Sequence, residues 1–141
     1  MLLLLFYCCS LLFVFLIQRA TIHWSQIITY VVVNEHMSSS SAQKYCRENF
    51  IDLATVRNEI QNQQLQSLDS NWAWIGLFRD PNFYWSDGSS FSFSHFDDVD
   101  NQNGSERVMC GVSSPHRAGR WRFLDCNIRI PFVCYSIPGE C

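Results

Sequence analysis

The chain has 141 residues, with 10 Lys and Arg against 13 Asp and Glu, and a net charge of −3. This length allows one domain of ordinary size. The apolar content of 48% and aromatic content of 15% exclude a chain that is disordered throughout. The negative charge argues against nucleic acid as the main partner. The sequence therefore predicts one small folded domain, with much of its apolar content in an N-terminal segment.

The N-terminal segment is an apolar run from Leu2 to Ile17 that only Ser10 interrupts. It is shorter than the ~20 residues that span a bilayer and longer than a minimal secretory core. We expect a signal peptide at residues 1–20, cleaved near Ala20, then a short segment at 21–29 and a secreted extracellular domain. The alternative is a membrane-anchored protein, because no Lys or Arg precedes the apolar run.

Cysteine usage agrees with secretion. Two cysteines lie in the leader and five in the body, at Cys46, Cys110, Cys126, Cys134 and Cys141, with no C-x-x-C pair. The four histidines stand apart, so the pattern indicates disulfides rather than a zinc site. Four cysteines allow three connectivities, and their spacing alone does not choose among them. Cys141 is left over, and we expect it to form a covalent homodimer or a mixed disulfide; the alternative is that a longer native tail supplies its partner.

Two helices are expected in the first half of the body. Ser40, with Gln43 three residues later, is typical of a capping box, which predicts a helix from Ser40 to about Asn49. A second helix is expected to start at Asn58. In that helix, the spacing places Ile60 and Leu65 or Leu68 inward and residues 61–66, with their glutamines, outward.

Strands are expected around and after the helices. The β-branched run from Ile27 to Val33 predicts an opening strand, and the aromatic-aliphatic run from Trp72 to Phe78 predicts a buried one. Arg79 and Asp80 are expected to turn the chain before Pro81. The predicted extended segments are 27–33, 52–56, 72–78, 107–112, 120–124 and 131–136. Helices followed by short strands and long loops predict an α+β domain.

Several motifs, in this order, resemble those of the C-type lectin-like domain family. They are Tyr45-Cys46-Arg47, Asp52-Leu53-Ala54-Thr55, Trp74-Ile75-Gly76-Leu77, Trp85-Ser86-Asp87-Gly88-Ser89 followed by Phe91 and Phe93, Trp121 before Cys126, and Pro131-Phe132-Val133-Cys134. The resemblance covers residues 30–136 and leaves a tail at 137–141. It implies a C-type lectin-like fold with two helices, small antiparallel sheets and a long loop region. Trp74, Gly76, Leu77 and Trp121 are then expected in the core, with Phe83 and Trp85 beneath the long loop.

The resemblance also implies the disulfide pairing, which is Cys46–Cys134 and Cys110–Cys126. The first pair would tie the first helix to the last strand. On the chain-entropy model, the longer bridge contributes about 4–5 kcal/mol to the free energy of unfolding and the shorter one about 3 kcal/mol. A domain of this size with long loops is expected to need both.

The long loop, Ser86 to Cys110, decides the expected function. In sugar-binding members of the family, Ca²⁺ is held by Glu-Pro-Asn or Gln-Pro-Asp in this loop and by Asn-Asp directly after the tryptophan, since a hard cation takes six to eight oxygens. Here the loop has no proline, and Arg122 and Phe123 follow Trp121. We therefore expect no cofactor and no family-type Ca²⁺ site. The remaining Ca²⁺ candidates are oxygen-bearing side chains of the loop, Asp98, Asp100, Asn103 and Glu106, and the alternative for them is a solvated acidic loop.

Other residues near this loop carry further expectations. Asn103-Gly104-Ser105 is a glycosylation acceptor. The last third of the chain is rich in arginine, at Arg107, Arg117, Arg120, Arg122 and Arg129. Guanidinium groups bind carboxylates, sulfates and phosphates, so these arginines could form a patch that binds an acidic glycan or an acidic protein face. The alternative is that they are spread evenly over the surface.

The sequence therefore predicts a secreted, non-catalytic recognition module that binds a glycan or an extracellular protein ligand. The candidate ligand-binding residues are Asp98, Asp100, Asn101, Asn103, Glu106, Arg120 and Arg122. The alternative is a small disulfide-stabilised hydrolase, in which His95 with Asp97 or Asp98 would serve as base and orienting group. No G-x-S-x-G motif frames a serine, so the binding module is preferred.

Overall fold

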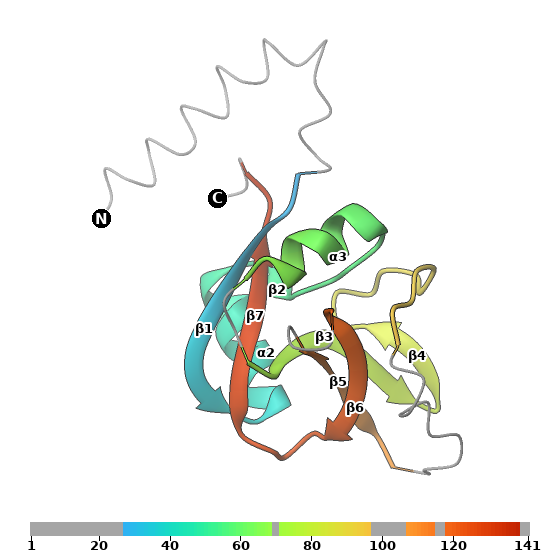
Figure 1. Ribbon diagram of the computed structural model, residues 1–141. Coiled ribbons are helices and arrows are strands. Elements are labelled where there is room, and N and C mark those ends of the chain that lie inside the picture. Colours follow the sequence, from blue (N-terminus) through green and yellow to red (C-terminus); the bar gives the residue numbers. More distant parts are fainter. Residues whose placement is uncertain (1–26, 69–70, 97–106, 115–117, 139–141) are drawn as a thin grey trace, which may run out of the picture. The chain divides into compact units, whose positions relative to one another are not determined.

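The computed structural model describes residues 27–68, 71–96, 107–114 and 118–138 (Figure 1). By its internal contacts the chain divides into two units, Tyr30–Tyr135 and the two chain ends. The helices and strands described below belong to the first unit, apart from the outermost residues of the first and last strands.

The described part of the chain contains two helices and seven strands. In chain order they are β1 (Thr29–Met37), α2 (Ser39–Asn49), β2 (Asp52–Leu53), α3 (Glu59–Gln66), β3 (Ala73–Asp80), β4 (Asn82–Trp85), β5 (Met109–Ser114), β6 (Arg120–Asp125) and β7 (Ile130–Ser136). The strands form one sheet in the order β1-β7-β3-β5-β6, to which β2 adds on β7 and β4 on β3. The first and last strands therefore lie side by side (Figure 1). The predicted α+β class is confirmed.

Helix α2 covers one face of this sheet. Its Ala42 and Cys46 are fully buried and pack in one cluster with Trp74, Val112 and Phe132 of the strands. The predicted core positions Trp74, Gly76, Leu77 and Trp121 are all buried, as expected. Gly76 is required by close approach, because a Cβ there would lie 3.1 Å from the Leu53 carbonyl oxygen and 3.2 Å from that of Ala54.

Both expected disulfides are present. Cys46–Cys134 joins α2 to β7 over a sequence separation of 88 residues, and Cys110–Cys126 joins β5 to the end of β6 over 16. The pairing that the family resemblance implied is thereby confirmed.

The start of α2 differs from the prediction. Ser38, rather than Ser40, caps the helix and accepts a hydrogen bond from the Ser41 backbone N–H. Four consecutive serines offer several equivalent caps, so a local rule does not select one. The choice comes from packing, because Ser39 is buried and its backbone N–H donates to the Cys126 carbonyl at 3.0 Å.

Helix α3 begins as predicted, but its buried face was predicted wrongly. The Asn58 side chain caps the helix, and Leu65 is buried as expected. Ile60, however, is 70% exposed, whereas Gln61 and Asn62 are buried. The Gln61 side chain accepts a hydrogen bond from the Arg57 backbone N–H at 2.7 Å, so its polar end is partnered and burial costs less.

The hairpin of β3 and β4 was also not predicted. Arg79 was expected to turn the chain, but it belongs to β3, is 8% exposed and pairs with Phe83. The chain reverses one residue later, since Asp80 pairs with Asn82 around Pro81. The short strand β4 has no alternating apolar pattern of its own, so only its pairing with β3 defines it.

Candidate functional site

Asp87, in the motif that opens the long loop, is the centre of a polar network. Its Oδ1 accepts hydrogen bonds from the backbone N–H and the hydroxyl of Ser89. Its Oδ2 accepts from the hydroxyls of Thr55 and Tyr135, each at 2.9 Å, and lies 3.6 Å from Nη2 of Arg57. The network therefore joins the start of the loop to β7 and to the segment before α3.

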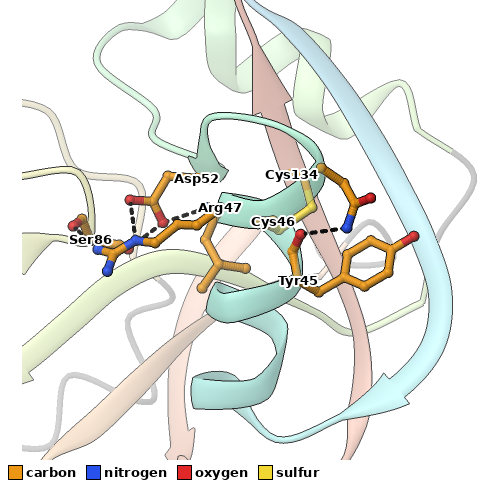
Figure 2. The surroundings of a disulfide bond; sticks show 8 residues. Tyr45, Cys46, Arg47, Asp52, Ser86 and Cys134 are labelled. Carbon is orange, nitrogen blue, oxygen red and sulfur yellow. Dashed lines mark hydrogen bonds and ion pairs between the residues drawn. A yellow bond between two sulfur atoms is a disulfide. The ribbon is translucent and has the colours of Figure 1, made fainter. Parts of the chain in front are cut away.

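A second carboxylate, Asp52, holds the residue before Asp87. Its Oδ1 accepts from the Ser86 hydroxyl at 2.6 Å, and its Oδ2 lies 3.1 Å from Nε of Arg47. Arg47 also donates to the Ser86 carbonyl at 3.0 Å. Figure 2 shows these contacts beside the Cys46–Cys134 disulfide, one residue along the same helix. The disulfide and the first residue of the long loop are thus held by one turn of α2.

The hydrogen bonds set the protonation of this network. Burial by itself raises the pKa of the Asp87 carboxyl, but the bonds from Ser89, Thr55 and Tyr135 outweigh it and leave the pKa below its ordinary value. Burial, with the bond to Asp87, raises the pKa of the Tyr135 hydroxyl well above its usual range. Burial likewise raises the pKa of Tyr30, whose hydroxyl donates to the Thr55 carbonyl. The network is therefore built from one ionised carboxylate and two neutral tyrosines.

These pKa shifts predict loss of stability at both ends of the pH range. Because the folded-state pKa of Asp87 is lowered, its contribution is present above the unfolded-state pKa of ~3.9 and is lost as the pH falls through the folded value. The tyrosine pKa values are raised, so their contribution is present below the unfolded value of ~10 and is lost as the pH rises above it. Urea unfolding from about pH 2 to about pH 11 would measure both limbs.

Asp87→Asn is the matched variant for the acid limb. It should be less stable than the wild type at pH 7, and its stability should fall less steeply below about pH 4, because the depressed carboxyl is gone. An unchanged acid limb in Asp87→Asn would show that other carboxyls cause the acid dependence.

Aromatic rings from the loop and two strands pack together on one face of β6. Because side chains alternate along a strand, this is the face opposite to Arg122. We call them the aromatic cluster: Phe83 and Trp85 of β4, Phe91, Phe93 and Phe96 of the loop, and Trp121 and Phe123 of β6. Along the loop, Phe91 and Phe93 are half-buried while Ser90, Ser92 and Ser94 are exposed. The expectation that Phe83 and Trp85 lie beneath the loop is confirmed, since both contact Phe91.

Phe123 contacts two rings of the aromatic cluster, one from β4 and one from the loop. Its ring stacks on Phe83 with centroids 5.5 Å apart, and the Phe96 centroid lies at the same distance. The Arg79 guanidinium lies 5.4 Å from its centroid. Arg122, which directly follows Trp121, also packs against an aromatic ring, because its guanidinium lies 5.0 Å from the centroid of the Trp72 ring. Where the sugar-binding pattern has Asn-Asp, this chain therefore has an aromatic stack and a cation–π contact.

The loop is also tied to the edge of the sheet. The Trp121 backbone N–H donates to the His95 carbonyl at 2.8 Å, and Phe96 forms a β-bridge with Trp121. The His95 ring nitrogen Nε2 lies 3.0 Å from the Ala118 carbonyl oxygen. Arg120 donates from Nη1 to the Phe96 carbonyl at 3.4 Å. Residues 95 and 96 thus run along the outer edge of β6.

The structure brings together only part of the predicted site. Arg120 and Arg122 lie on β6, whereas Arg129 lies outside the strands and Arg107 ion-pairs with Asp125 at 3.9 Å. The remaining predicted residues lie outside the described part of the chain, and what was expected of them stays a prediction. They are the loop residues Asp97, Asp98, Asp100, Asn101, Asn103 (also the glycosylation acceptor) and Glu106, together with Arg117, the leader and Cys141. The sequence analysis did not predict that Thr55 and Tyr135 donate hydrogen bonds to Asp87. The available signal was the carboxylate of Asp87 in the W-S-D-G-S motif, which needs hydrogen-bond donors.

The described ranges contain neither a candidate metal-binding cluster nor a helix that could cross a membrane. No three His, Cys, Asp or Glu side chains within residues 27–68, 71–96, 107–114 and 118–138 gather in a way that could hold a metal ion. In the same part of the chain, neither helix has the length and apolar character needed to cross a membrane.

The sequence and the fold are both similar to those of known proteins. The chain is 28% identical over 118 residues to the secretory phospholipase A2 receptor of Oryctolagus cuniculus, a match that covers 79% of this chain but 8% of the receptor. It is 29% identical over 116 residues to lithostathine of Rattus norvegicus, covering 74% of this chain and 70% of that protein. The cow C-type carbohydrate-recognition domain of CD23 has the same fold, with a TM-score of 0.71 at 17% identity over 82% of this chain and 92% of that one. The model of the lectin C-type domain family matches residues 35–136, and the chain therefore belongs to that family.

Proposed function

We propose that the protein is a secreted, non-catalytic recognition module that binds a carbohydrate or protein ligand through the face formed by the long loop and β6. In this proposal, binding does not use the family's Ca²⁺-dependent sugar site. The module acts by presenting side chains on a rigid scaffold rather than by transforming its ligand.

The observation that carries the proposal is the packing of Phe123. A Ca²⁺ site needs six to eight oxygen ligands, and the side chain of Phe123 offers none. The ring packs against Phe83 and Phe96 and so fastens the loop to the sheet, which is a task that a bound cation would otherwise perform. The neighbouring residue Arg122 has a positively charged guanidinium, which would repel Ca²⁺.

Secretion is supported by the two disulfides, which persist in oxidising compartments. Ligand binding is supported by the relatives. One of them is by name a receptor, and the CD23 domain was solved in the presence of an oligosaccharide. Binding is also favoured over hydrolysis because Nε2 of His95 contacts the Ala118 carbonyl, which is a structural use of that ring.

A glycan and protein array, run once with about 1 mM Ca²⁺ and once with chelator, tests the proposal. We expect the same ligands under both conditions, and a melting temperature that Ca²⁺ leaves nearly unchanged, because a ligand stabilises only as ln(1 + [L]/Kd). Binding that disappears with chelator, or a rise of several degrees with Ca²⁺, would contradict Ca²⁺ independence. Turnover of esterase or peptidase substrates that is lost in His95→Ala would contradict the absence of catalysis.

A further inference from the structure

Segment 90–94 of the long loop has the alternating burial of a β-strand. Ser90, Ser92 and Ser94 are exposed, whereas Phe91 and Phe93 between them are half-buried. An extended backbone produces this period of two, since successive side chains point to opposite faces. The segment is therefore extended, with hydroxyl groups on one face and aromatic rings on the other.

The two rings hold this segment in place. Phe91 packs against Phe83 and Trp85, with ring centroids 5.1 Å and 6.4 Å apart. Phe93 meets the Trp121 ring edge-on, with centroids 5.8 Å apart. Because these contacts order the segment before a ligand arrives, binding there costs the protein little conformational entropy.

The backbone of this segment has no hydrogen-bond partner among the described residues. Its N–H and C=O groups form no hydrogen bond within residues 27–68, 71–96, 107–114 and 118–138. The next residue, His95, does, because its carbonyl accepts from the Trp121 backbone N–H on β6. Backbone groups of successive residues point to alternate edges of a strand, so those of residues 91 and 93 point towards β6, as the His95 carbonyl does. The groups of Ser90, Ser92 and Ser94 then line the opposite, outer edge.

The sequence places no blocking residue along this edge. Natural proteins use Lys, Pro or β-bulges to stop an exposed strand edge from pairing with another strand. Residues 88–96 contain no Lys, Arg, Asp, Glu or Pro. An edge of this kind favours an uncharged, extended peptide, because a peptide offers a regular row of N–H and C=O groups and a saccharide does not.

We propose that segment 90–94 binds an extended peptide segment of a protein ligand, which adds a strand along the outer edge. Main-chain hydrogen bonds to Ser90, Ser92 and Ser94 provide the affinity. The preferred peptide alternates hydroxyl residues, which lie beside the serines, with apolar residues, which lie beside Phe91 and Phe93. This inference rests on the recognition function proposed above and names a peptide as the ligand.

The test uses the whole protein, with an end-blocked nonapeptide of alternating threonine and valine as the probe. With the peptide in excess, amide hydrogen exchange read by NMR should slow by about tenfold or more at Ser90, Ser92 and Ser94, and not at Phe91 and Phe93. The same peptide with all its amides N-methylated should bind about tenfold more weakly or less tightly still, because it donates no hydrogen bond. Protection that is absent, or equal at all five residues, would overturn strand addition.

Ser92→Pro and Ser92→Ala are the matched variants. Proline removes the Ser92 N–H but fits an extended, unpaired segment, so the free variant should melt within a few degrees of the wild type. Ser92→Pro should weaken peptide binding by about tenfold, and Ser92→Ala, which removes only the hydroxyl, by about threefold or less. Equal losses in the two variants would assign the contact to the hydroxyl and overturn strand addition. If Ser92→Pro melts much earlier, the exchange pattern of the wild type decides.

Two other results would assign the edge to a different occupant. A homodimer in sedimentation that Ser92→Pro abolishes would assign it to a second copy of this chain. An uncharged mannose oligosaccharide that displaces the peptide would assign it to a saccharide. Either result overturns the peptide ligand.

The outcome also separates the inference from the function on which it rests. If array ligands bind and Ser92→Pro keeps full affinity for all of them, the strand-addition site is wrong and the recognition function stands. If neither the array nor the peptide gives binding, the recognition function itself is wrong.

Discussion

Replacing Cys46 and Cys134 together with alanine is expected to lower the free energy of unfolding by about 4–5 kcal/mol. The bridge joins residues 88 apart, so its removal frees a large part of the unfolded chain. Both cysteines are fully buried within the core cluster, so the variant also loses packing around α2. Urea unfolding at neutral pH, monitored by tryptophan fluorescence, measures the loss.

The matched control is Cys110→Ala with Cys126→Ala. This bridge closes 16 residues, and its removal is expected to cost about 3 kcal/mol. The order of the two losses is the prediction. A larger loss from the shorter bridge would show that chain entropy does not govern the stability of this domain, and that local packing at each bridge does.

The second large effect concerns the aromatic cluster. Phe123→Ala is expected to lower the free energy of unfolding by about 2–4 kcal/mol, because it removes a ring that contacts Phe83, Phe96 and the Arg79 guanidinium. Since Phe96 and His95 are bonded to Trp121, the change should also speed hydrogen exchange at the Trp121 backbone N–H. Urea unfolding and amide exchange give the two readings.

Tyr84→Ala is the control for this effect. Tyr84 is also an aromatic residue of β4, but it is 43% exposed and stacks on Phe78 with ring centroids 5.4 Å apart. Its removal should cost about 1 kcal/mol and leave exchange at Trp121 unchanged. If Phe123→Ala costs no more than Tyr84→Ala, the aromatic cluster does not fasten the loop, and the main support for the proposed Ca²⁺ independence is lost.

A double-variant cycle would separate direct packing from general loss of stability. Phe96→Ala and Phe123→Ala are expected to be coupled by about 0.5–1.5 kcal/mol, the range found for aromatic pairs in contact. Phe123 and Tyr84 are expected to show little coupling, because their rings belong to opposite faces of the sheet, as the strand register implies.

The polar network and the aromatic cluster hold different parts of the loop segment 86–96. Asp52 and Asp87 bind the first residues of the loop to α2, β7 and the segment before α3. The rings bind its later residues to β6. Both ends of residues 86–96 are thus held by side chains of the chain itself, which supports the proposal that the recognition surface needs no bound cation.

Much of this arrangement follows from local signals that the sequence carries on its own. The α+β class, the existence of both helices and the three late strands near 107–112, 120–124 and 131–136 were predictable, because apolar periodicity and cap residues act within a few positions. The order of motifs around Trp74, Trp85 and Trp121 identified the family, and with it the disulfide pairing, which spacing alone left open among three possibilities.

Tertiary structure alone decided the details that involve distant partners. The cap of α2 is Ser38 because Ser39 is buried and its backbone N–H donates to the carbonyl of Cys126. Arg79 lies in a strand because β4 pairs with it. No local pattern contains these partners, since each is contributed by another segment, or by a backbone group, whose position is set only when the chain is folded. The sequence by itself determined that the side chains of Arg122 and Phe123 supply no metal-binding oxygens, and only the packing of Trp72, Phe83 and Phe96 around them decided what those two side chains do instead.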